Sequence, residues 1–388
     1  MSEQKNDFVD ISSSSEVDKL YLTDKGTKGN GKGSKSSLVV RVSILVLSII
    51  MLIGGVGAIV GYRMLDNLNF KEIVKPTDPA GSTKETTVSV NQTGTSLLQS
   101  DDVLNILLFG QDAKGDGQSY GRSDTTILMS IDNLNKKIKL TSFQRDTYVN
   151  IPGYGDNKIN AAFSLGGEGL SIDTIEANFG IKVDKYATVD FSSFRKIIEI
   201  LGGVDIELNL EEIEYINAQI DVNNQLGKTS FLEYDPYKEL QVMHLDGYQA
   251  LWYARDRGEM NLGGNPNYSF SGDDWDRTSR QRKLIETIIK DMRSATLPEI
   301  VGIINEVGPL VTTNLKKEDI AFLAANVLTY IGYDMDQLSL PTEGAWRYGR
   351  TDDGQSVIVI SDWDKVRYDL AAYIYESAVV SSTQSQSD

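Results

Sequence analysis

The feature that most constrains this chain is an apolar run from Val42 to Tyr62, bounded by Arg41 and Arg63. Its 21 uncharged residues, at a helical rise of about 1.5 Å each, match the roughly 30 Å hydrocarbon core of a bilayer. A chain that contains such a run must fold as separate parts on the two sides of a membrane. We therefore predict a single transmembrane helix over residues 42–62.

The charges on either side of this run predict its orientation. Five lysines and arginines lie in the twenty residues before it and three in the twenty after it, which places the N-terminus in the cytoplasm. Residues 1–41 are Ser/Lys/Gly-rich and are expected to form a disordered cytoplasmic tail, and residues 63–100 a polar linker. A cleaved signal peptide fits poorly, because the leader is long and polar and no clear cleavage site follows. We expect a single-pass cell-membrane protein whose remaining domain is extracytoplasmic.

The composition limits the chemistry of that domain. The chain has no cysteine and a single histidine, His244, which excludes disulfides, thiolate sites and multi-histidine zinc sites. His244 precedes a predicted helix and is interpreted as structural. The formal charge of −17 argues against a nucleic-acid partner. Any chemistry must come from carboxylates, arginines and hydroxyls.

Hydrophobic patterning predicts an α/β domain over residues 101–376, with a central mixed β-sheet flanked by helices. The runs 103–110, 125–132 and 136–143 read as strands, and the last two form an antiparallel hairpin. The acidic residues 211–240 are predicted to be an irregular insertion, and 377–388 a disordered tail. Further strands are expected at "YATVD", "VDIEL" and "SVIVIS", and helices over about 170–179, 191–201 after the cap Asp190, 246–255, 276–294, 298–306, 316–331 and in "WDKVRYDLAAYIYESA".

Acidic and basic residues are predicted to meet at one edge of the sheet. Asp124 precedes the first strand of the hairpin, and Arg145 and Asp146 follow the second, so they lie at the same edge. A glycine-rich loop after the preceding strand brings Asp112 and Arg122 there if it turns back. Two carboxylates without His or Cys suit Mg²⁺, or Mn²⁺. The simpler alternative is a set of loop caps and surface salt bridges.

Residues 250–282 hold five of the fourteen arginines and no lysine. A helical count places Arg277 and Gln281 on the inward stripe of the predicted helix that begins near residue 276. A buried arginine needs an anion, and its planar guanidinium suits the two-point grip of a phosphate. A pyrophosphate would fit such a site. Arg280 and Arg282 fall on the flanks of the helix and are predicted to be solvated or paired with Asp273, Asp274 and Asp276.

Several motifs along the predicted domain are specific in combination. They are "NILLFGQD", "GRSDTTILMS", "TSFQRDTYVNIPG", "KINAAF", "FSSFRKIIEILGGVDI", "LDGYQALWYARDR" and "DDWDRTSRQR". Together they resemble the LytR-CpsA-Psr family of membrane-anchored cell-wall phosphotransferases, from about residue 101 to the final helix. One departure is "SFQRDT", where the family more often has Ile-Pro before the Arg-Asp pair. It affects the backbone before Arg145 and leaves its charge in place.

The resemblance implies an α/β/α fold with a hydrophobic tunnel for a polyprenyl chain. It implies transfer of a glycopolymer from a polyprenyl-pyrophosphate carrier to a peptidoglycan hydroxyl, forming a phosphodiester and releasing polyprenyl phosphate. It also implies that Asp112 and Asp124 associate with Mg²⁺. The positions that match pyrophosphate contacts in the family are Arg122, Arg145, Arg255, Arg257, Arg277 and Gln281.

Three questions stay open at the level of sequence. Asp124, Asp112 and Asp146 are equally good candidates to accept the proton of the attacking hydroxyl. A hydrolase that uses water on the same lipid pyrophosphate, and a non-enzymatic transcriptional attenuator, are the alternative functions. The cytoplasmic tail has no apolar periodicity with which to build a DNA-binding module, which counts against the attenuator. The glycopolymer, whether wall teichoic acid, capsule or another, is not identified.

Overall fold

The computed structural model of the chain describes residues 69–71, 97–112 and 120–376. The predicted cytoplasmic tail, transmembrane span and C-terminal tail, and most of the predicted linker, lie outside these residues. Among the described residues, no helix has the length and apolar character that crossing a membrane requires.

Strands and helices are interleaved along the described chain, as predicted for an α/β domain. The strands are β1 (Asn69–Phe70), β2 (Val103–Gln111), β3 (Ser123–Asp132), β4 (Lys137–Phe143), β5 (Thr147–Ile151), β6 (Gly155–Lys158), β7 (Lys185–Asp190), β8 (Val204–Asn209), β9 (Leu240–Leu245), β10 (Thr312–Thr313), β11 (Asp334–Leu340), β12 (Trp346–Arg350) and β13 (Ser356–Ile360). The α-helices are α2 (Ile159–Phe179), α3 (Phe191–Ile200), α4 (Leu210–Val222), α5 (Gly247–Arg255), α6 (Asp274–Asp291), α7 (Leu297–Val307), α8 (Lys317–Tyr330) and α9 (Trp363–Tyr375).

The largest sheet has seven strands in the order β1-β10-β7-β2-β3-β4-β11. Strand β2 runs antiparallel to β3 and parallel to β7, while β3 and β4 form the predicted antiparallel hairpin. The central mixed sheet of the sequence prediction is therefore confirmed. A four-stranded sheet, β12-β13-β5-β6, and the hairpin β8-β9 stand apart from it.

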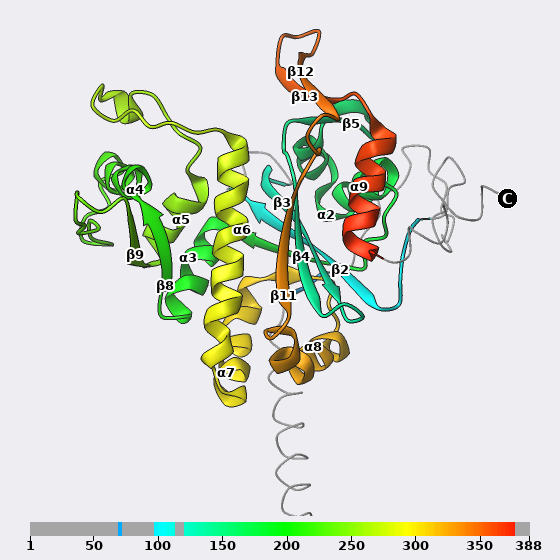
Figure 1. The fold of residues 1–388 in the computed structure, drawn as a ribbon, viewed down its shortest axis with the longest axis horizontal. Coiled ribbons are helices and arrows are strands. Elements are labelled where there is room, and N and C mark those ends of the chain that lie inside the picture. The colour runs from blue at the N-terminus through cyan, green and yellow to red at the C-terminus, as the bar shows by residue number, and fades with distance from the viewer. Residues whose placement is uncertain (1–68, 72–96, 113–119, 377–388) are drawn as a thin grey trace, which may run out of the picture. The chain divides into compact units, whose positions relative to one another are not determined.

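Both faces of the seven-stranded sheet are covered, because its central strand is apolar on both sides. Along β2, Leu107 and Phe109 belong to the core beneath α2 and α9, whereas Ile106 belongs to the core on the opposite face. Residues of α6 and α8 pack into that second core. Figure 1 shows α2 and α9 on one side of the sheet and α6 on the other.

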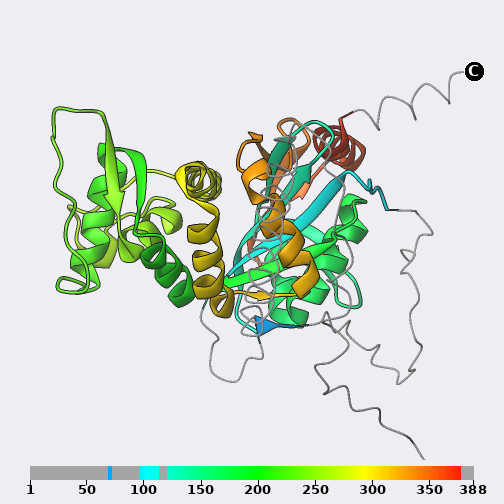
Figure 2. The same ribbon diagram turned by 90° about the horizontal axis from the view of Figure 1, so that it is seen from below.

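A separate lobe is formed by α3, α4, α5, β8 and β9 around its own apolar core. Seen from below, the lobe stands beside the sheet, with α6 and α7 between the two (Figure 2). The prediction of an irregular insertion over 211–240 was wrong in its first part. Ile213, Ile216 and Ile220 of helix α4 are fully buried in the lobe core, and the acidic residues between them conceal this spacing in the sequence.

Three aspartates cap the N-termini of helices α3, α5 and α6. The Asp190 side chain accepts a hydrogen bond from the Ser193 backbone at the start of α3, as predicted. Asp246 and Asp273 cap α5 and α6 in the same way, each within a capping box. Such caps are worth about 1 kcal/mol each. They determine which side chains occupy the first turn of each helix.

Two boundaries differ from the sequence prediction. The predicted linker 63–100 includes β1, which pairs with β10 at the sheet edge, and Leu98, whose backbone bonds to Gly180 and Lys182. Short pairings of this kind carry no hydrophobic pattern, so the sequence did not indicate them. Helix α2 begins eleven residues before the predicted 170–179 and contains a break at Gly166 and Gly167. Gly167 has a φ of 64°, and a side chain there would meet the Tyr120 ring.

Candidate functional site

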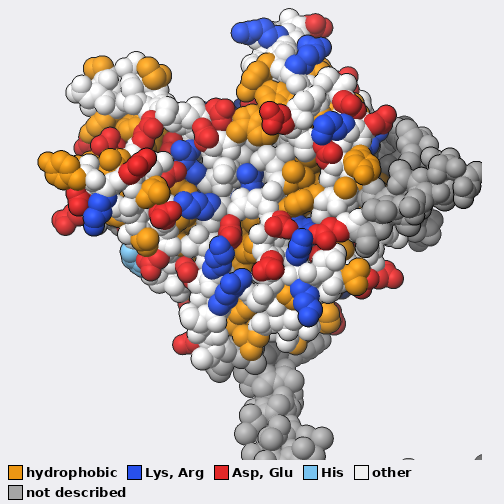
Figure 3. All heavy atoms as spheres, viewed as in Figure 1, with side chains coloured by type: hydrophobic (Ala, Val, Ile, Leu, Met, Phe, Trp, Pro, Cys, Tyr) orange, Lys and Arg blue, Asp and Glu red, His pale blue; other side chains and the backbone are white. Residues whose placement is uncertain are grey.

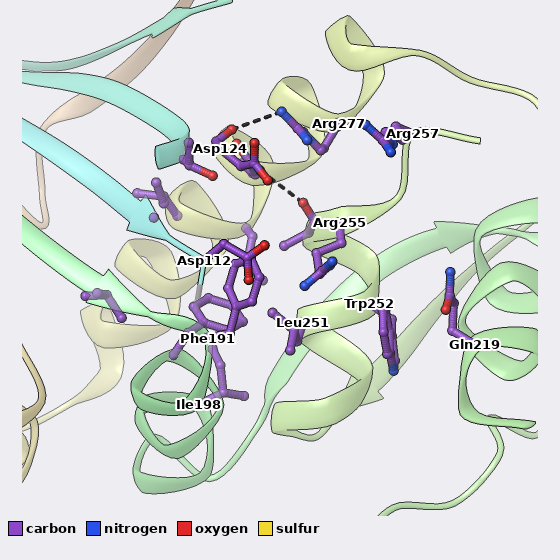
Figure 4. A pocket seen from close by; sticks show the side chains of 18 of the residues that line it. Asp112, Asp124, Phe191, Ile198, Gln219, Leu251, Trp252, Arg255, Arg257 and Arg277 are labelled. Carbon is purple, nitrogen blue, oxygen red and sulfur yellow. Dashed lines mark hydrogen bonds between the residues drawn. The ribbon is translucent and has the colours of Figure 1, made fainter. Parts of the chain in front are cut away.

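A cavity of about 730 Å³ lies between one face of the seven-stranded sheet and the lobe. The sheet contributes residues of β2, β3 and β7, and the opposite wall comes from α3, α4, α5 and α6. Ligand sites commonly have volumes of roughly 300–1,000 Å³. Figure 4 shows side chains from these elements directed toward the same space.

Most of the cavity wall is hydrocarbon, and we call this part the apolar body. Side chains alternate along β7, so Ala187 and Val189 face the cavity, while Tyr186 packs in the core on the other face of the sheet. Hydrocarbon that enters the apolar body leaves water, which stabilises binding by about 25 cal/mol per Å². Its other main residues are Leu108, Ile127, Phe191, Phe194, Ile197, Ile198, Leu251, Leu284, Ile285 and Ile288.

Charged side chains gather at one end of the cavity, which we call the polar end. Arg145 Nη1 donates a hydrogen bond to Asp124 Oδ1 at 3.0 Å, so the two ends of the β3-β4 hairpin meet as predicted. From the first turn of α6, Arg277 Nη2 donates to the Asp124 carbonyl oxygen at 2.9 Å. Burial acts to lower the pKa of Arg145, but nearby carboxylates outweigh it and hold that pKa above its usual value.

Asp274 completes this cluster, and the sequence reasoning missed its role. Its Oδ1 lies 2.8 Å from Arg277 Nη2 and 3.1 Å from Arg145 Nε. Burial raises the pKa of Asp274, and the two arginines only partly oppose that shift. Burial likewise lowers the pKa of Arg277 in spite of the carboxylate beside it. The i, i+3 spacing of Asp274 and Arg277 on α6 was the available signal, but Asp274 had been interpreted as a surface partner.

Several polar atoms of the polar end are buried with no hydrogen-bond partner among the described residues. They include the Nε atoms of Arg145 and Arg277, both carboxylate oxygens of Asp274 and Oε1 of Gln281. The ion pairs are therefore close in distance without forming well-directed hydrogen bonds. Gln281 Nε2 is held by the Ala254 carbonyl at 3.1 Å. Buried polar groups are rarely left unbonded in proteins, so Arg277 Nε and Gln281 Oε1, which also take part in no ion pair among the described residues, are candidates to contact a ligand.

Asp112 lines the cavity immediately after β2. In Figure 4 it lies between Asp124 and Phe191, where the polar end meets the apolar body. Its backbone nitrogen donates to the Arg122 carbonyl at 3.0 Å. A Cβ atom at Gly121 would lie 2.3 Å from the Asp112 carbonyl oxygen, so this close turn requires glycine. Two carboxylates, Asp112 and Asp124, thus face one cavity from neighbouring strands.

Arg255 and Arg257 reach the cavity from the end of α5. The Arg255 guanidinium lies 4.5 Å from the Phe191 ring centroid and 5.4 Å from that of Trp252, within range of cation–π attraction. Asp256 between them is turned inward, where it lies 3.4 Å from Arg280 Nη2 and accepts from the Gly258 backbone. Burial raises the pKa of Asp256 to about 6. This buried contact fixes the segment that presents the two arginines.

The arrangement agrees with a match to known proteins. A model of the LytR_cpsA_psr family matches residues 68–367. The chain belongs to the LytR_cpsA_psr family. The match begins at β1, which supports the earlier start of the domain.

Relatives within the LytR_cpsA_psr family carry different kinds of names. The polyisoprenyl-teichoic acid–peptidoglycan teichoic acid transferase TagU of Enterococcus faecalis is 31% identical over 245 residues, which cover 62% of this chain and 71% of TagU. The regulatory protein MsrR of Staphylococcus aureus is 29% identical over 268 residues, or 68% of this chain and 72% of MsrR.

Solved structures agree with the fold. The crystal structure of Bacillus subtilis TagV gives a TM-score of 0.52 at 28% identity, covering 71% of this chain and 98% of TagV. TagT bound to LIIa-WTA gives a TM-score of 0.54 at 23% identity, covering 74% of this chain and 99% of TagT. At that level of identity, the likeness indicates a shared fold alone.

Two predicted site residues, Arg122 from the LytR_cpsA_psr resemblance and Asp146 from the hairpin geometry, are not among the residues that line the cavity. Arg122 is exposed and is not among the lining residues, although its backbone holds Asp112. Asp146 Oδ1 lies 2.7 Å from Lys158 Nζ, and its other oxygen lies 3.8 Å from Arg145 Nε. Asp146 lines a separate small depression beside the polar end.

The prediction that Arg280 and Arg282 are surface residues was wrong. Arg280 is largely buried and pairs with Glu212 at 2.8 Å and with Asp256, linking α6 to α4 and α5. Arg282 is only 7% exposed, and it donates to Ser142 Oγ at 2.7 Å and to Gln337 Oε1 at 3.1 Å. Helix α6 is covered by the sheet on one side and by the lobe on the other, so its flanks are buried as well as its inward stripe.

Neither His244 nor a preformed metal-binding cluster is found at the cavity among the described residues. His244 is exposed on β9, where its Nδ1 lies 2.6 Å from Asp205 Oδ1, and it is not among the residues that line the cavity. Within the described ranges, no group of three or more His, Asp or Glu side chains is arranged to hold a metal ion. A cation at Asp112 and Asp124 would need further ligands from elsewhere.

Proposed function

We propose that this chain is a membrane-anchored phosphotransferase that moves a glycopolymer from a polyprenyl-pyrophosphate carrier to a peptidoglycan hydroxyl. The observation that carries the proposal is the division of one cavity into an apolar body and a polar end. A polyprenyl pyrophosphate has the same division, with a long hydrocarbon chain that ends in two anionic phosphates. The guanidinium groups of Arg145 and Arg277, which line the cavity, supply positive charge at the junction.

The names of relatives support the reaction class. TagU and the Bacillus subtilis TagV, which is 33% identical over 217 residues, are both polyisoprenyl-teichoic acid–peptidoglycan teichoic acid transferases. A polyisoprenyl carrier is a lipid, which accounts for the size of the apolar body. We propose a teichoic acid or a related anionic wall polymer as the cargo.

The donor set suits Mg²⁺, with Mn²⁺ as the alternative. Asp112 and Asp124 would hold the ion, which prefers oxygen ligands and commonly takes only one or two carboxylates when phosphate oxygens complete its shell. The lack of a third protein ligand among the described residues fits a site of this shared kind. When bound, the ion would neutralise charge on the pyrophosphate.

The chain's own residues account for binding and charge stabilisation. Arg145, Arg255, Arg257 and Arg277 would hold the pyrophosphate oxygens, and Gln281 would add its amide. The acceptor hydroxyl oxygen attacks the phosphorus that carries the glycopolymer, and the bond from that phosphorus to the bridging oxygen breaks. The products are a phosphodiester and polyprenyl phosphate, whose new negative charge is stabilised by the guanidinium groups.

The hydroxyl proton needs an acceptor near the guanidinium groups. Asp112, Asp124 and Asp146 were the candidates from sequence, and Asp274 joins them through its contacts with Arg145 and Arg277. A carboxylate with a raised pKa is the better base for such a transfer, and the pKa of Asp274 is raised by burial. From the carboxylate the proton passes to water.

A membrane anchor fits this substrate. A lipid carrier stays in the bilayer, so an enzyme tethered to the same surface meets it at a high effective concentration. The predicted span 42–62 would provide that tether, with the domain on the extracytoplasmic side where peptidoglycan lies.

The proposal is tested with the full-length protein in detergent and Mg²⁺. A polyprenyl-pyrophosphate-linked teichoic acid precursor is supplied with and without a peptidoglycan oligomer, and the products are analysed by mass spectrometry. We expect a polymer–peptidoglycan phosphodiester together with polyprenyl phosphate only when the oligomer is present. Release of polymer phosphate without the oligomer at the same rate would identify a hydrolase and refute the transfer.

Matched variants separate chemistry from folding in this assay. Arg255→Ala should abolish transfer, whereas Tyr368→Ala, at an exposed site on α9, should leave it unchanged. If deletion of residues 1–35 abolished polymer attachment in cells while Arg255→Ala did not, the enzyme proposal would be abandoned for a regulatory one.

A further inference from the structure

Three aromatic side chains form a surface beside the polar end that the proposed donor site does not use. Trp275 of α6 stacks on Trp346 of β12, with ring centroids 5.1 Å apart and planes at 27°. Tyr348 meets the Trp346 ring edge to face at 4.9 Å. We call Trp275, Trp346 and Tyr348 the aromatic platform. Trp346 and Tyr348 are two residues apart on one strand, so they project from the same face of the sheet.

The platform is accessible. Tyr348 is 62% exposed, and Trp275 and Trp346 are partly exposed. In Figure 1 the β12-β13 hairpin projects above the first turn of α6, and Figure 3 shows hydrophobic side chains near the base of this projection. Aromatic rings held in contact and left in water are costly to the free protein, so a group of three points to a binding surface.

A small depression connects the platform to the polar end. It has a volume of about 60 Å³ and is lined by Trp275 and Tyr348 together with Asp146, Asp273 and Asp274. This is the space of about two water molecules, which suits a hydroxymethyl or acetamido group of a sugar rather than a whole ring. Asp274 lines the depression and also contacts Arg145 and Arg277, which line the main cavity. One carboxylate therefore separates the two spaces.

We propose that the aromatic platform binds the sugar chain of the peptidoglycan acceptor and directs its hydroxyl toward the polar end. The inference rests on the proposed transfer reaction. A pyranose ring has a face of C–H groups that packs on aromatic rings, while its hydroxyls donate hydrogen bonds to carboxylates such as Asp146. The described residues that line the depression include no lysine or arginine. Lys158 and Arg145 pair with two of its carboxylates, Asp146 and Asp274, which leaves no excess positive charge for an anionic donor polymer, whereas uncharged sugar rings need none.

The position of the platform agrees with the direction of attack. In phosphoryl transfer the attacking and leaving oxygens lie roughly in line on opposite sides of phosphorus. The leaving polyprenyl phosphate stays with the apolar body, so the acceptor must approach from the other side of the arginines. Asp274 contacts both Arg145 and Arg277 and also lines the depression, so the depression adjoins these arginines. Trp346 and Tyr348 are accordingly positioning residues that act on the acceptor alone.

The kinetic test uses the full-length protein with Mg²⁺, saturating donor and varied peptidoglycan oligomer. We expect Trp346→Ala and Tyr348→Ala each to raise the acceptor KM by about three- to tenfold, the range of a lost aromatic contact. The donor KM and the kcat at saturating acceptor should stay at wild-type values. Trp346→Phe should restore most of the acceptor affinity, and Tyr368→Ala, with a similarly exposed tyrosine on α9, should change neither KM.

A binding measurement without chemistry accompanies the kinetics. A tetramer of β-1,4-linked N-acetylglucosamine is titrated into the full-length protein by calorimetry, and Trp346→Ala and Tyr348→Ala should weaken its binding by the same factors. Because Tyr348 is mostly exposed, its variant keeps the test valid if Trp346→Ala does not fold.

The outcomes separate this inference from the proposed function. Unchanged acceptor KM in both variants overturns the inference and leaves the transferase intact, and a raised donor KM overturns it by assigning the platform to the donor glycan. Absence of transfer by the wild type refutes the proposed function itself, and the acceptor assignment with it.

Discussion

The two parts of the cavity are built from different parts of secondary structure. At the polar end, Asp124 and Arg145 stand at the ends of paired strands, and Arg277 stands in the first turn of α6. The apolar body is lined from element interiors, such as Ala187 in β7 and Ile288 in α6. Element ends converge from distant segments and bring opposite charges together, whereas interiors supply continuous hydrocarbon. One helix, α6, contributes to both parts and sets the distance between them.

The two parts of the cavity also differ in whether their buried atoms have the contacts that they require. Side chains of the apolar body such as Ile198 and Leu284 belong to the lobe core and are almost fully buried. The polar end keeps buried atoms without hydrogen-bond partners in the described protein. Changes at the polar end should therefore alter the chemical step, and changes in the apolar body should alter affinity for the lipid.

Removal of the proposed divalent cation should have the largest effect. We expect EDTA to reduce transfer by on the order of 1,000-fold, because charge on the pyrophosphate would no longer be neutralised. Added Mg²⁺ or Mn²⁺ should restore the rate. Binding of polyprenyl phosphate to the apolar body should survive chelation in a calorimetric titration. Undiminished transfer in EDTA would show that Asp112 and Asp124 hold no required ion.

Arg277→Ala should come next, with a loss of about 100- to 1,000-fold in kcat. A preorganised donor removed from a charge-stabilising site has an effect of this size. Since Asp274 keeps its contact with Arg145, the midpoint of thermal unfolding should change little. Steady-state rates and a melting curve check both statements. A variant with wild-type kcat would place the pyrophosphate elsewhere.

Ala187→Phe should affect the apolar body alone. The new ring would occupy cavity space beside β7 and displace several methylene groups of a long lipid, raising the KM of a long-chain donor by about 10- to 100-fold. The kcat with a two-isoprene donor should not change. Ala187→Ser is the control, because it adds little volume. Equal effects on long and short donors would indicate that the lipid does not reach β7.

Arg282→Met should have the smallest effect on activity. Burial lowers the pKa of Arg282 to about 10, and this arginine donates hydrogen bonds to the neutral partners Ser142 and Gln337. The guanidinium stays charged at neutral pH in both folded and unfolded chains, so the cost of burying it is independent of pH there. Methionine removes that cost, and we expect unfolding free energy to rise by about 1 kcal/mol with kcat unchanged. A large loss of kcat would extend the polar end to this arginine.

The hairpin and the inward face of α6 were predictable because each depends on a local period. The antiparallel pairing of two alternating strands placed Asp124 beside Arg145 at one edge of the sheet, and helical spacing placed Arg277 and Gln281 inward. The same helical rule failed for Arg282, since it assumes one buried stripe and α6 is covered on two sides. The helical rule also failed to predict α4. There, the acidic residue Glu212 forms a capping box at the start of the helix and an ion pair with Arg280.

The remaining features depend on contacts between distant segments. Asp274 is only one of several aspartates at the start of α6 until the fold brings Arg145 to it. Likewise, the aromatic platform requires α6 to meet β12, some seventy residues later in the chain. No spacing within either segment predicts that meeting.

The apolar body has a consequence for the time course of the reaction. In the proposed reaction, the hydrocarbon contacts that would hold the donor would also hold the lipid product, because transfer changes only the head group. We therefore expect departure of polyprenyl phosphate into the bilayer to be slower than bond breaking, a pattern found in enzymes whose turnover is limited by product release. A rapid first turnover followed by a slower steady rate is the expected signature, and the supply of membrane able to accept the lipid would set that slower rate.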